Sequence, residues 1–437
     1  MKKSISSLCL SFVFFLSIHN CEAQSQKTVP QKFNPKPDLK AVGTTPQKIS
    51  GIDSLLQSYV NDKKVTSVVG FVAKGGNIVY NKAFGLKDPE NNIVATPEDY
   101  YVLFSQTKAI ASVAFMTLVE KGLVSVNDPV SKYFPEISDQ VATGVNADGT
   151  FITRPAKTPM TFAHLLSHSS GLNAGVIGQG RRIQTQKADS LRKASGNVQA
   201  DNAPGQRKTR SLKENMEELA KYPLGFDPGS EWSYHISTTM LSYMVERISG
   251  KSFRDYVKET VLIPLGMNDT DWYYDQDKLN RFVKIYTSVN GKLEPSSNAV
   301  SERTISADRS YAEGALGLNG PIEDYAKFCQ MMLNKGTFNG KQILKPETIE
   351  QMTTINQLPE INSGGKGFKF GLGFQLYNDQ REPTPQVSNT AYAWGGAYGT
   401  EYIIDPENDL IALFYINMPK HDPLVPGFLN KAYQLFK

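Results

Sequence analysis

The chain has 437 residues, with 47 lysines and arginines, 43 aspartates and glutamates, and a formal net charge of +4. With 40% hydrophobic and 21% charged residues it is neither a disordered nor a collagen-like chain. The balanced charge lacks the basic domain typical of nucleic-acid binding, and three cysteines are too few for a disulfide scaffold, so we expect neither a nucleic-acid partner nor a disulfide-rich fold.

The first 23 residues have the pattern of a secretory signal peptide. A basic start at positions 2–3 precedes an apolar run over 4–18, and Cys21-Glu22-Ala23 supplies small residues at a cleavage site. The run is too short to span a bilayer comfortably, so we expect no membrane span. The pattern predicts export, to the periplasm or outside the cell. A lipid anchor at Cys21 is the alternative, although Asn20 is a poor residue before a lipidated cysteine.

Residues 24–49 are polar and contain four prolines, which predicts a flexible, extended or disordered tether before a folded domain over 50–437. Ser50 is expected to cap a first helix, whose apolar residues recur at helical spacing. Residues 65–73 and 77–84 then predict a β-hairpin around Lys74-Gly75-Gly76.

Helices dominate the middle of the chain. Apolar spacing and end signals predict helices over 105–121, 161–169 and 237–249, one opened by the capping box Ser211-x-x-Glu214, and one with Pro321 in its first turn. Between them, residues 176–213 are rich in lysine and arginine and poor in apolar residues. We interpret this stretch as a solvated, mobile insertion; a lid or a patch for anionic surfaces is the alternative.

The tail returns to strands, predicted over 368–377, 392–394, 400–404 and 410–416, with a closing helix over 426–436. Strands therefore lie at both ends of the chain and helices lie between them. This order predicts an α+β fold in which one antiparallel sheet combines both chain ends and the central helices form a second lobe.

Several common catalytic signatures are missing. The sequence has no Gly-x-Ser-x-Gly elbow and no P-loop. His164 and His168 have the spacing of metal ligands on a helix, but the glutamate of a zinc-protease motif is absent, so we expect no metal and no cofactor. Hydrogen bonding around the turn at residues 169–171 is the simpler role for the two histidines.

Ser105-Gln106-Thr107-Lys108 opens the long apolar helix and is the outstanding feature of the sequence. Residues three apart share a helix face, so the Lys108 amine can reach the Ser105 hydroxyl. A serine needs a base beside it to act as a nucleophile, and a lysine shielded from water can be neutral and accept its proton. Alone the motif is weak, because Ser190 and Lys193 repeat it within the basic stretch.

Two later motifs strengthen this interpretation. Tyr234 ends the loop at residues 228–234 where a helix begins, and a tyrosine near a lysine loses its proton more easily and can act as a base. Trp394-Gly395-Gly396-Ala397 lies on a late strand, where glycines let a substrate approach the backbone and a strand N–H can bind an oxyanion. The alternatives are a core tyrosine and a glycine bulge.

Together with the stretches at 127–130 and 164–172, these motifs resemble the serine β-lactamase-like hydrolases: class C β-lactamases, D,D-peptidases and family VIII carboxylesterases. The resemblance spans about residues 52–436. It implies Ser105 as the acylated nucleophile, Lys108 as its proton acceptor or electrostatic partner, and Tyr234 as general base and acid. It also implies an oxyanion hole made by the N–H groups of Ser105 and Ala397.

Two departures from the family pattern favour the esterase branch. Ile236 stands where the family often has an asparagine that binds a substrate amide, and Trp394 stands where a lysine or histidine favours a substrate carboxylate. Arg309 is a candidate for supplying that missing charge. We therefore expect a carboxylesterase for small neutral esters; the alternatives are a β-lactamase or D,D-peptidase with a cell-wall-derived substrate, and an inactive protein that binds cell-wall fragments.

Overall fold

The structure is a computed structural model, which describes residues 29–194, 211–296, 302–305, 308–377, 386–419 and 424–437. The predicted signal peptide with Cys21, and residues 195–210 of the basic stretch, lie outside these ranges. Within them, no helix has the length and apolar character needed to cross a membrane.

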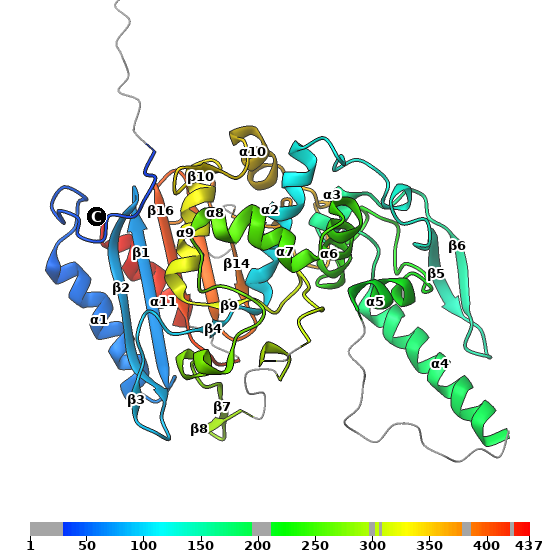
Figure 1. Ribbon diagram of the computed structural model, residues 1–437, viewed down its shortest axis with the longest axis horizontal. Coiled ribbons are helices and arrows are strands. Elements are labelled where there is room, and N and C mark those ends of the chain that lie inside the picture. The colour runs from blue at the N-terminus through cyan, green and yellow to red at the C-terminus, as the bar shows by residue number, and fades with distance from the viewer. Residues whose placement is uncertain (1–28, 195–210, 297–301, 306–307, 378–385, 420–423) are drawn as a thin grey trace, which may run out of the picture.

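An antiparallel sheet of eight strands, in the order β12-β13-β14-β15-β16-β1-β2-β3, forms the centre of the fold. The late strand β16 pairs directly with the early strand β1, so both parts of the chain share one sheet (Figure 1). This confirms the predicted α+β fold. The strands of this sheet are β1 (Ser67–Lys74), β2 (Asn77–Asp88), β3 (Ile93–Val94), β12 (Lys369–Phe370), β13 (Gln375–Leu376), β14 (Tyr392–Gly396), β15 (Thr400–Asp405) and β16 (Leu410–Tyr415).

Helices cover both faces of the sheet, which explains why β1 is a continuous apolar run rather than an alternating one. Helices α1 (Pro46–Asn61) and α11 (Leu424–Gln434) pack on one face, and α9 (Ile322–Leu333) packs on the other (Figure 1). Gly70 of β1 allows α11 to approach closely, because a Cβ there would lie 2.7 Å from the Phe428 ring.

The remaining helices form the second lobe and its link to the sheet (Figure 1). Helix α2 packs against α6, which is also contacted by α3, α5 and α7. The predicted capping box of Ser211 and Glu214 is present, and Gly250 ends α6 in the left-handed conformation. These helices are α2 (Thr107–Glu120), α3 (Phe162–Leu166), α4 (Ala174–Ala194), α5 (Leu212–Leu219), α6 (Ile236–Ser249), α7 (Phe253–Val257), α8 (Ile263–Leu265) and α10 (Pro346–Thr354).

Four short two-stranded sheets lie outside the central sheet. The β4-β9 pair leads the chain into α2 and lies next to the site described below. The pairs are β4 (Tyr101–Val102) with β9 (Asn319–Gly320), β5 (Gln140–Val145) with β6 (Phe151–Pro155), β7 (Tyr286–Val289) with β8 (Lys292–Pro295), and β10 (Thr337–Phe338) with β11 (Lys341–Gln342).

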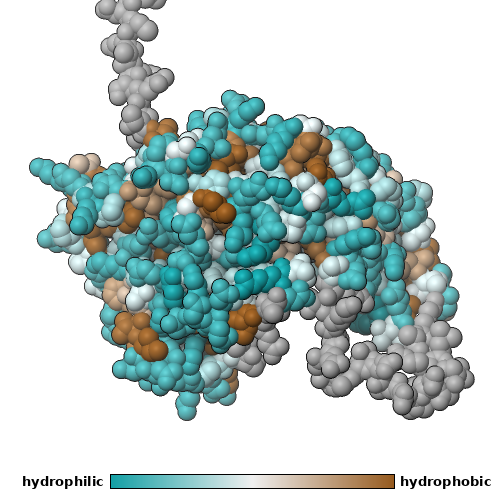
Figure 2. Space-filling model, viewed as in Figure 1, coloured by the Kyte–Doolittle hydropathy of each residue, from teal (hydrophilic) through white to brown (hydrophobic). Residues whose placement is uncertain are grey.

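Apolar side chains gather in two large clusters. One lies between the sheet and the helices of the second lobe, and the other lies between the sheet, α1 and α11. In the view of Figure 2, hydrophilic residues cover most of the surface and apolar residues are scattered among them. Scattered exposed apolar residues are normal for a folded protein, so this face alone indicates no docking surface.

The tether predicted over 24–49 is wrong for its described part. The Phe33 ring packs against Phe71 and Phe338, with ring centroids 5.4 and 5.2 Å apart. Helix α1 begins at Pro46, with Thr45 rather than Ser50 as its N-cap. Proline is favoured in the first helical turn because it lacks the N–H that would be unsatisfied there, and the Thr45 hydroxyl accepts a hydrogen bond from the Lys48 N–H at 3.3 Å.

The first half of the insertion predicted over 176–213 belongs to helix α4, and most of its described positions after Gly180 are exposed, as expected for a solvated stretch. Ile177 is only 5% exposed and lies in the core of the second lobe. Gly180 packs under Tyr222, whose ring would lie 2.3 Å from a Cβ at that position. Its few apolar and small residues therefore anchor the start of this basic segment.

We predict that Phe33→Ala lowers the free energy of unfolding by about 1–3 kcal/mol, less than truncation of a fully buried phenylalanine because this ring is half-buried. Urea denaturation measures the change, and Lys36→Ala, an exposed position in the same segment, is the control. Equal stability of both variants would show that residues 29–45 do not anchor to the body.

Candidate active site

Ser105 lies at the entrance to α2, within a 3₁₀ turn formed by Phe104–Gln106. Phe104 has a φ of 45°, which is uncommon outside glycine, and its ring packs on Tyr398 with centroids 4.4 Å apart. Residues 107–118 of α2 are all buried, so the helix is fixed by packing on every side. The N-terminus of this rigid helix therefore holds the serine, with a partial positive field beside it.

The side chain of Lys108 is 2% exposed and points toward Ser105. Its Nζ lies 3.0 Å from the Ser105 Oγ, donates to the Ala315 carbonyl at 2.6 Å, and lies 3.4 Å from the His235 Nδ1. Burial lowers the pKa of Lys108 to about 7, although the nearby charge of Glu313 opposes this shift. The spacing predicted from the sequence is confirmed, and the lysine is poised between its two protonation states at neutral pH.

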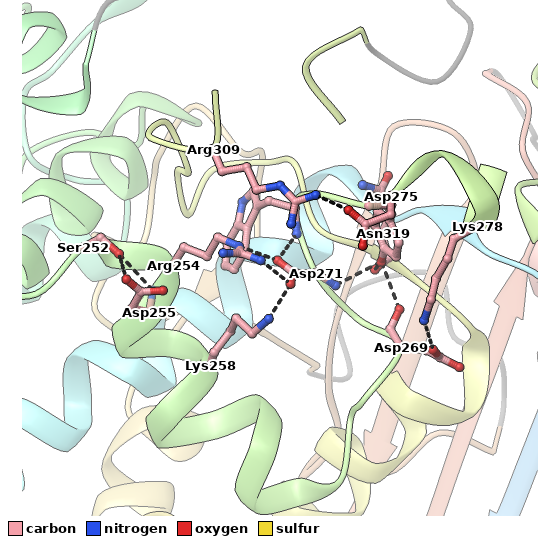
Figure 3. A network of polar contacts seen from close by, with 12 residues as sticks. Ser252, Arg254, Asp255, Lys258, Asp269, Asp271, Asp275, Lys278, Arg309 and Asn319 are labelled. Atoms are coloured by element: carbon pink, nitrogen blue, oxygen red, sulfur yellow. Dashed lines mark hydrogen bonds and ion pairs between the residues drawn. The ribbon is translucent and has the colours of Figure 1, made fainter. Parts of the chain in front are cut away.

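The Ala315 carbonyl accepts the hydrogen bond from Lys108. The chain that follows it contacts a polar network (Figure 3). Asp271 accepts hydrogen bonds from the Arg254 guanidinium at 2.7 Å and from Lys258 at 2.6 Å. Its backbone pairs in both directions with that of Asn319, four residues after Ala315. The network therefore anchors the chain at Asn319, four residues after the carbonyl that accepts the hydrogen bond from Lys108.

Tyr234 faces the same serine from the start of α6. Its hydroxyl accepts a hydrogen bond from the Trp394 Nε1 at 2.9 Å and is hydrogen-bonded to Ser105. Its ring stacks on Trp232 and lies under the Lys108 Nζ, 4.6 Å from the ring centroid. These contacts join the predicted nucleophile, lysine and tyrosine into one cluster.

The expectation that the lysine makes Tyr234 easier to deprotonate is wrong. Burial raises the pKa of Tyr234 to about 12, and its hydrogen bonds with Ser105 and Trp394 only partly offset this rise. The physical reason is that the same burial favours the neutral form of Lys108, which then offers little positive charge to stabilise a tyrosinate. At neutral pH the tyrosine is therefore a proton donor.

Strand β14 presents the predicted glycine motif next to the serine. β13 pairs with β14 only at Tyr392 and Ala393, so the ladder between them stops before Trp394. Gly396 lies against the turn that leads to Ser105, because a Cβ there would lie 2.4 Å from the Leu103 carbonyl oxygen. A side chain at this position would push the strand away from the serine.

A cavity of about 400 Å³ opens at Ser105 and includes Tyr234, Trp394, Gly395, Gly396 and Ala397 in its lining. The structure therefore brings together almost all of the predicted site. The exception is Ile236, the first residue of α6, which packs against the main core and is not among the described residues that line the cavity. The oxyanion role of the Ser105 and Ala397 N–H groups remains a prediction.

Three other candidate residues, Arg309, His164 and His168, lie outside the catalytic contacts described above. Arg309 donates to Asp275 at the polar network, so its guanidinium is engaged away from the cavity lining (Figure 3). His164 accepts the Thr161 N–H at 3.2 Å and completes a capping box, while His168 is buried with its ring against Tyr234. In the described ranges, no three or more histidine, cysteine, aspartate or glutamate residues form a group that could hold a metal ion.

Sequence reasoning missed three contributors to the site. The Ala315 carbonyl and Glu401 are far from Ser105 in sequence. The path of a loop positions Ala315, and the register of β14 and β15 positions Glu401. His235 follows Tyr234 directly, so adjacency was a usable signal; its φ of 98° turns its Nδ1 toward Lys108. Burial lowers the pKa of His235 to about 4, so this ring is neutral beside the lysine.

Comparison with known proteins gives three consistent matches. The chain matches the family Beta-lactamase over residues 52–428. It is 26% identical over 384 residues to the esterase EstB of Burkholderia gladioli, covering 84% of this chain and 89% of the esterase. It is 25% identical over 414 residues, covering 89% of this chain and 87% of the relative, to a Salmonella agona (strain SL483) protein named provisionally as a D-alanyl-D-alanine carboxypeptidase.

Among solved structures, the fold is similar to that of EstCE1, described as a hydrolase with promiscuous acyltransferase activity. The TM-score is 0.69 at 22% sequence identity, over 89% of this chain and 98% of EstCE1. At this identity the likeness supports the shared fold, and the polar contacts around Ser105 carry the chemistry.

We predict that the rate at which a fluorophosphonate labels Ser105 rises about tenfold per pH unit below pH 7 and becomes constant above it, because Lys108 accepts a proton only in its neutral form. Labelling is followed by intact mass spectrometry. His235 and His168 have pKa values well below 7, so the titration of neither ring explains a labelling rate that rises up to pH 7. Lys108→Arg, which stays charged, should label slowly at every pH; a flat profile in the wild type would refute the neutral lysine.

Proposed function

The chain belongs to the beta-lactamase family of serine hydrolases, and from this premise we propose that it is a carboxylesterase that cleaves small neutral esters through an acyl-enzyme on Ser105. One observation carries the proposal. The Trp394 Nε1 donates to the Tyr234 hydroxyl, so the indole has no N–H left for a substrate carboxylate. Among the described residues that line the cavity, none is a lysine or an arginine.

Acylation follows from the contacts of Lys108. Two protons of the neutral amine face the Ala315 carbonyl and His235, which leaves its lone pair for the Ser105 hydroxyl at 3.0 Å. The amine takes the hydroxyl proton as the Oγ bonds to the ester carbonyl carbon. The negative charge that develops on the carbonyl oxygen is stabilised by the N–H groups of Ser105 and Ala397.

The tetrahedral intermediate then collapses, and the bond to the alcohol oxygen breaks. Tyr234 is protonated at neutral pH and hydrogen-bonded to Ser105, so it can pass a proton to the leaving alkoxide and recover one from the Lys108 ammonium. A water molecule repeats the sequence on the acyl-enzyme, giving its proton to Lys108 and releasing the acid. Both half-reactions thus return the lysine and the tyrosine to their starting forms.

β-Lactams and D-alanyl peptides, the alternative substrates, carry a carboxylate. The described cavity lining has no lysine or arginine to pair with it. β-Lactams and peptides ending in D-alanine need a cation or free donors beside the nucleophile. Here that place is taken by an apolar, already hydrogen-bonded indole. The relative EstB carries the name of an esterase, which supports the same choice. Export, proposed from the pattern of residues 1–23, would place this activity outside the cytoplasm.

The test is kcat/KM of the wild type for p-nitrophenyl butyrate and for nitrocefin. We expect the ester to be preferred on the order of 10²-fold or more, since sites without polar partners reject substrates that must bury polar groups. Ser105→Ala should lose on the order of 10³-fold or more in kcat. Comparable or higher efficiency on nitrocefin would make the protein a β-lactamase, and no labelling by a fluorophosphonate would make it a binding protein.

A further inference from the structure

The carbonyl that accepts the hydrogen bond from Lys108 belongs to a segment, residues 313–315, that contacts two helices at once. A Cβ at Gly314 would lie 2.5 Å from the Ala111 Cβ of α2 and 2.7 Å from the Ser242 Oγ of α6. Ala111 lies three residues after Lys108 on the same buried helix, so the segment packs on the helix face that carries the lysine. Any side chain at Gly314 would push the segment away from these helices.

Two hydroxyl groups of α6 hold the segment by hydrogen bonds, and both side chains are buried. The Ser242 Oγ accepts the Gly314 N–H at 2.6 Å and donates to the Thr238 carbonyl at 2.7 Å. The Thr239 hydroxyl donates to the Glu313 carboxylate at 2.8 Å. Because residues three apart share a helix face, Thr239 and Ser242 form one contact surface for the segment.

The peptide group between Glu313 and Gly314 is hydrogen-bonded at both ends. Its N–H donates to the α6 serine, and its carbonyl accepts the Trp272 Nε1 at 3.0 Å. The orientation of the chain is therefore fixed two residues before the Ala315 carbonyl, which accepts the Lys108 Nζ at 2.6 Å. A fixed acceptor holds the amine in one direction, which is how supporting contacts position a catalytic group.

The same segment places a negative charge near the lysine. Burial is the main cause of the lowered pKa of Lys108, and the charge of Glu313 opposes it. The other titratable side chains around this cluster are those of Tyr234, His235, His168 and Glu401. At neutral pH the tyrosine and both imidazoles are uncharged, and the second carboxylate acts on the tyrosine. Glu313 therefore supplies the charge that partly offsets the burial of the ammonium.

We propose that residues 313–315 are a positioning segment, which α6 holds against α2 so that the Lys108 amine points at Ser105. The carbonyl of the segment sets the direction of the amine, and its carboxylate stabilises the ammonium that forms when the amine accepts the serine proton. This inference rests on the proposed acyl-enzyme mechanism. It adds Thr239 and Ser242 to that mechanism, as positioning residues that act through the lysine.

Ser242→Ala tests the direction of the amine, because it removes the acceptor of the Gly314 N–H. We expect the rate at which a fluorophosphonate labels Ser105 at pH 9 to fall about tenfold, since the amine is no longer held in line with the hydroxyl. The titration midpoint of Lys108, followed by the carbon-13 shift of its Cε, should also move to lower pH, because the ammonium loses a well-placed acceptor. A merely structural role would lower stability and leave this midpoint unchanged.

The matched control is Ser58→Ala, which removes a helical hydroxyl of α1 that donates to the Leu55 carbonyl at 2.8 Å. Helix α1 belongs to the apolar cluster on the other face of the sheet, so this variant should keep the wild-type labelling rate and midpoint.

Glu313→Gln tests the charge, because it keeps an oxygen for the Thr239 hydroxyl and removes the carboxylate. The ammonium is then less stable, so the Lys108 midpoint should fall by about one pH unit. The ratio of the labelling rates at pH 8 and pH 6 should decrease from about tenfold to about twofold, because the variant amine is already half neutral at pH 6. Glu407→Gln, at an exposed turn after β15, is the control and should keep the wild-type ratio.

Failure of this inference is distinguishable from failure of the acyl-enzyme proposal. If the wild type is labelled at Ser105, and folded Ser242→Ala and Glu313→Gln have its rates and midpoint, the positioning segment is refuted while the acyl-enzyme stands. If the wild type is not labelled, the acyl-enzyme proposal fails. The Lys108 midpoint then decides alone: a lower value in Glu313→Gln supports the segment, and an unchanged value refutes it.

Discussion

Lys108 has lost almost all contact with water, and the lowered pKa of its ammonium follows from that burial rather than from a neighbouring positive charge. An amine that is neutral near pH 7 can accept the serine proton, which an ordinary surface lysine cannot do. The same burial keeps Tyr234 protonated. In the mechanism that we propose, one constraint, the exclusion of water around two side chains, therefore makes the lysine the base and the tyrosine the acid.

The fold keeps water away from Lys108 and Tyr234. Helix α2 is buried along almost its whole length between the sheet and the second lobe, so Ser105 and Lys108 are held by a rigid element. The second lobe contributes Tyr234, and the late strand β14 contributes the cavity wall. The Asp271 network anchors Asn319, four residues after the Ala315 carbonyl that accepts from Lys108. Because β13 leaves β14 unpaired from Trp394 onward, the cavity can extend around the strand toward α11.

Contacts between residues that are close in sequence could be predicted from the sequence. The Ser105–Lys108 contact follows from helical periodicity, and the pairing of early and late strands follows from the order of elements. What depends on the register between distant strands was not readable, such as Glu401 folding over Gly395. The anchoring of Phe33 and of Ile177 was missed because both lie in polar stretches, where a single buried side chain has no periodic pattern.

The central claim is that Lys108 is substantially neutral at pH 7 in the folded protein. The carbon-13 shift of its Cε, followed against pH in lysine-labelled protein and assigned by comparison with Lys108→Arg, measures this directly. The account predicts a midpoint near the pKa of about 7 that burial imposes on Lys108. A midpoint near the ordinary value of 10.5 would contradict it, because the amine would then be charged when Ser105 must lose its proton.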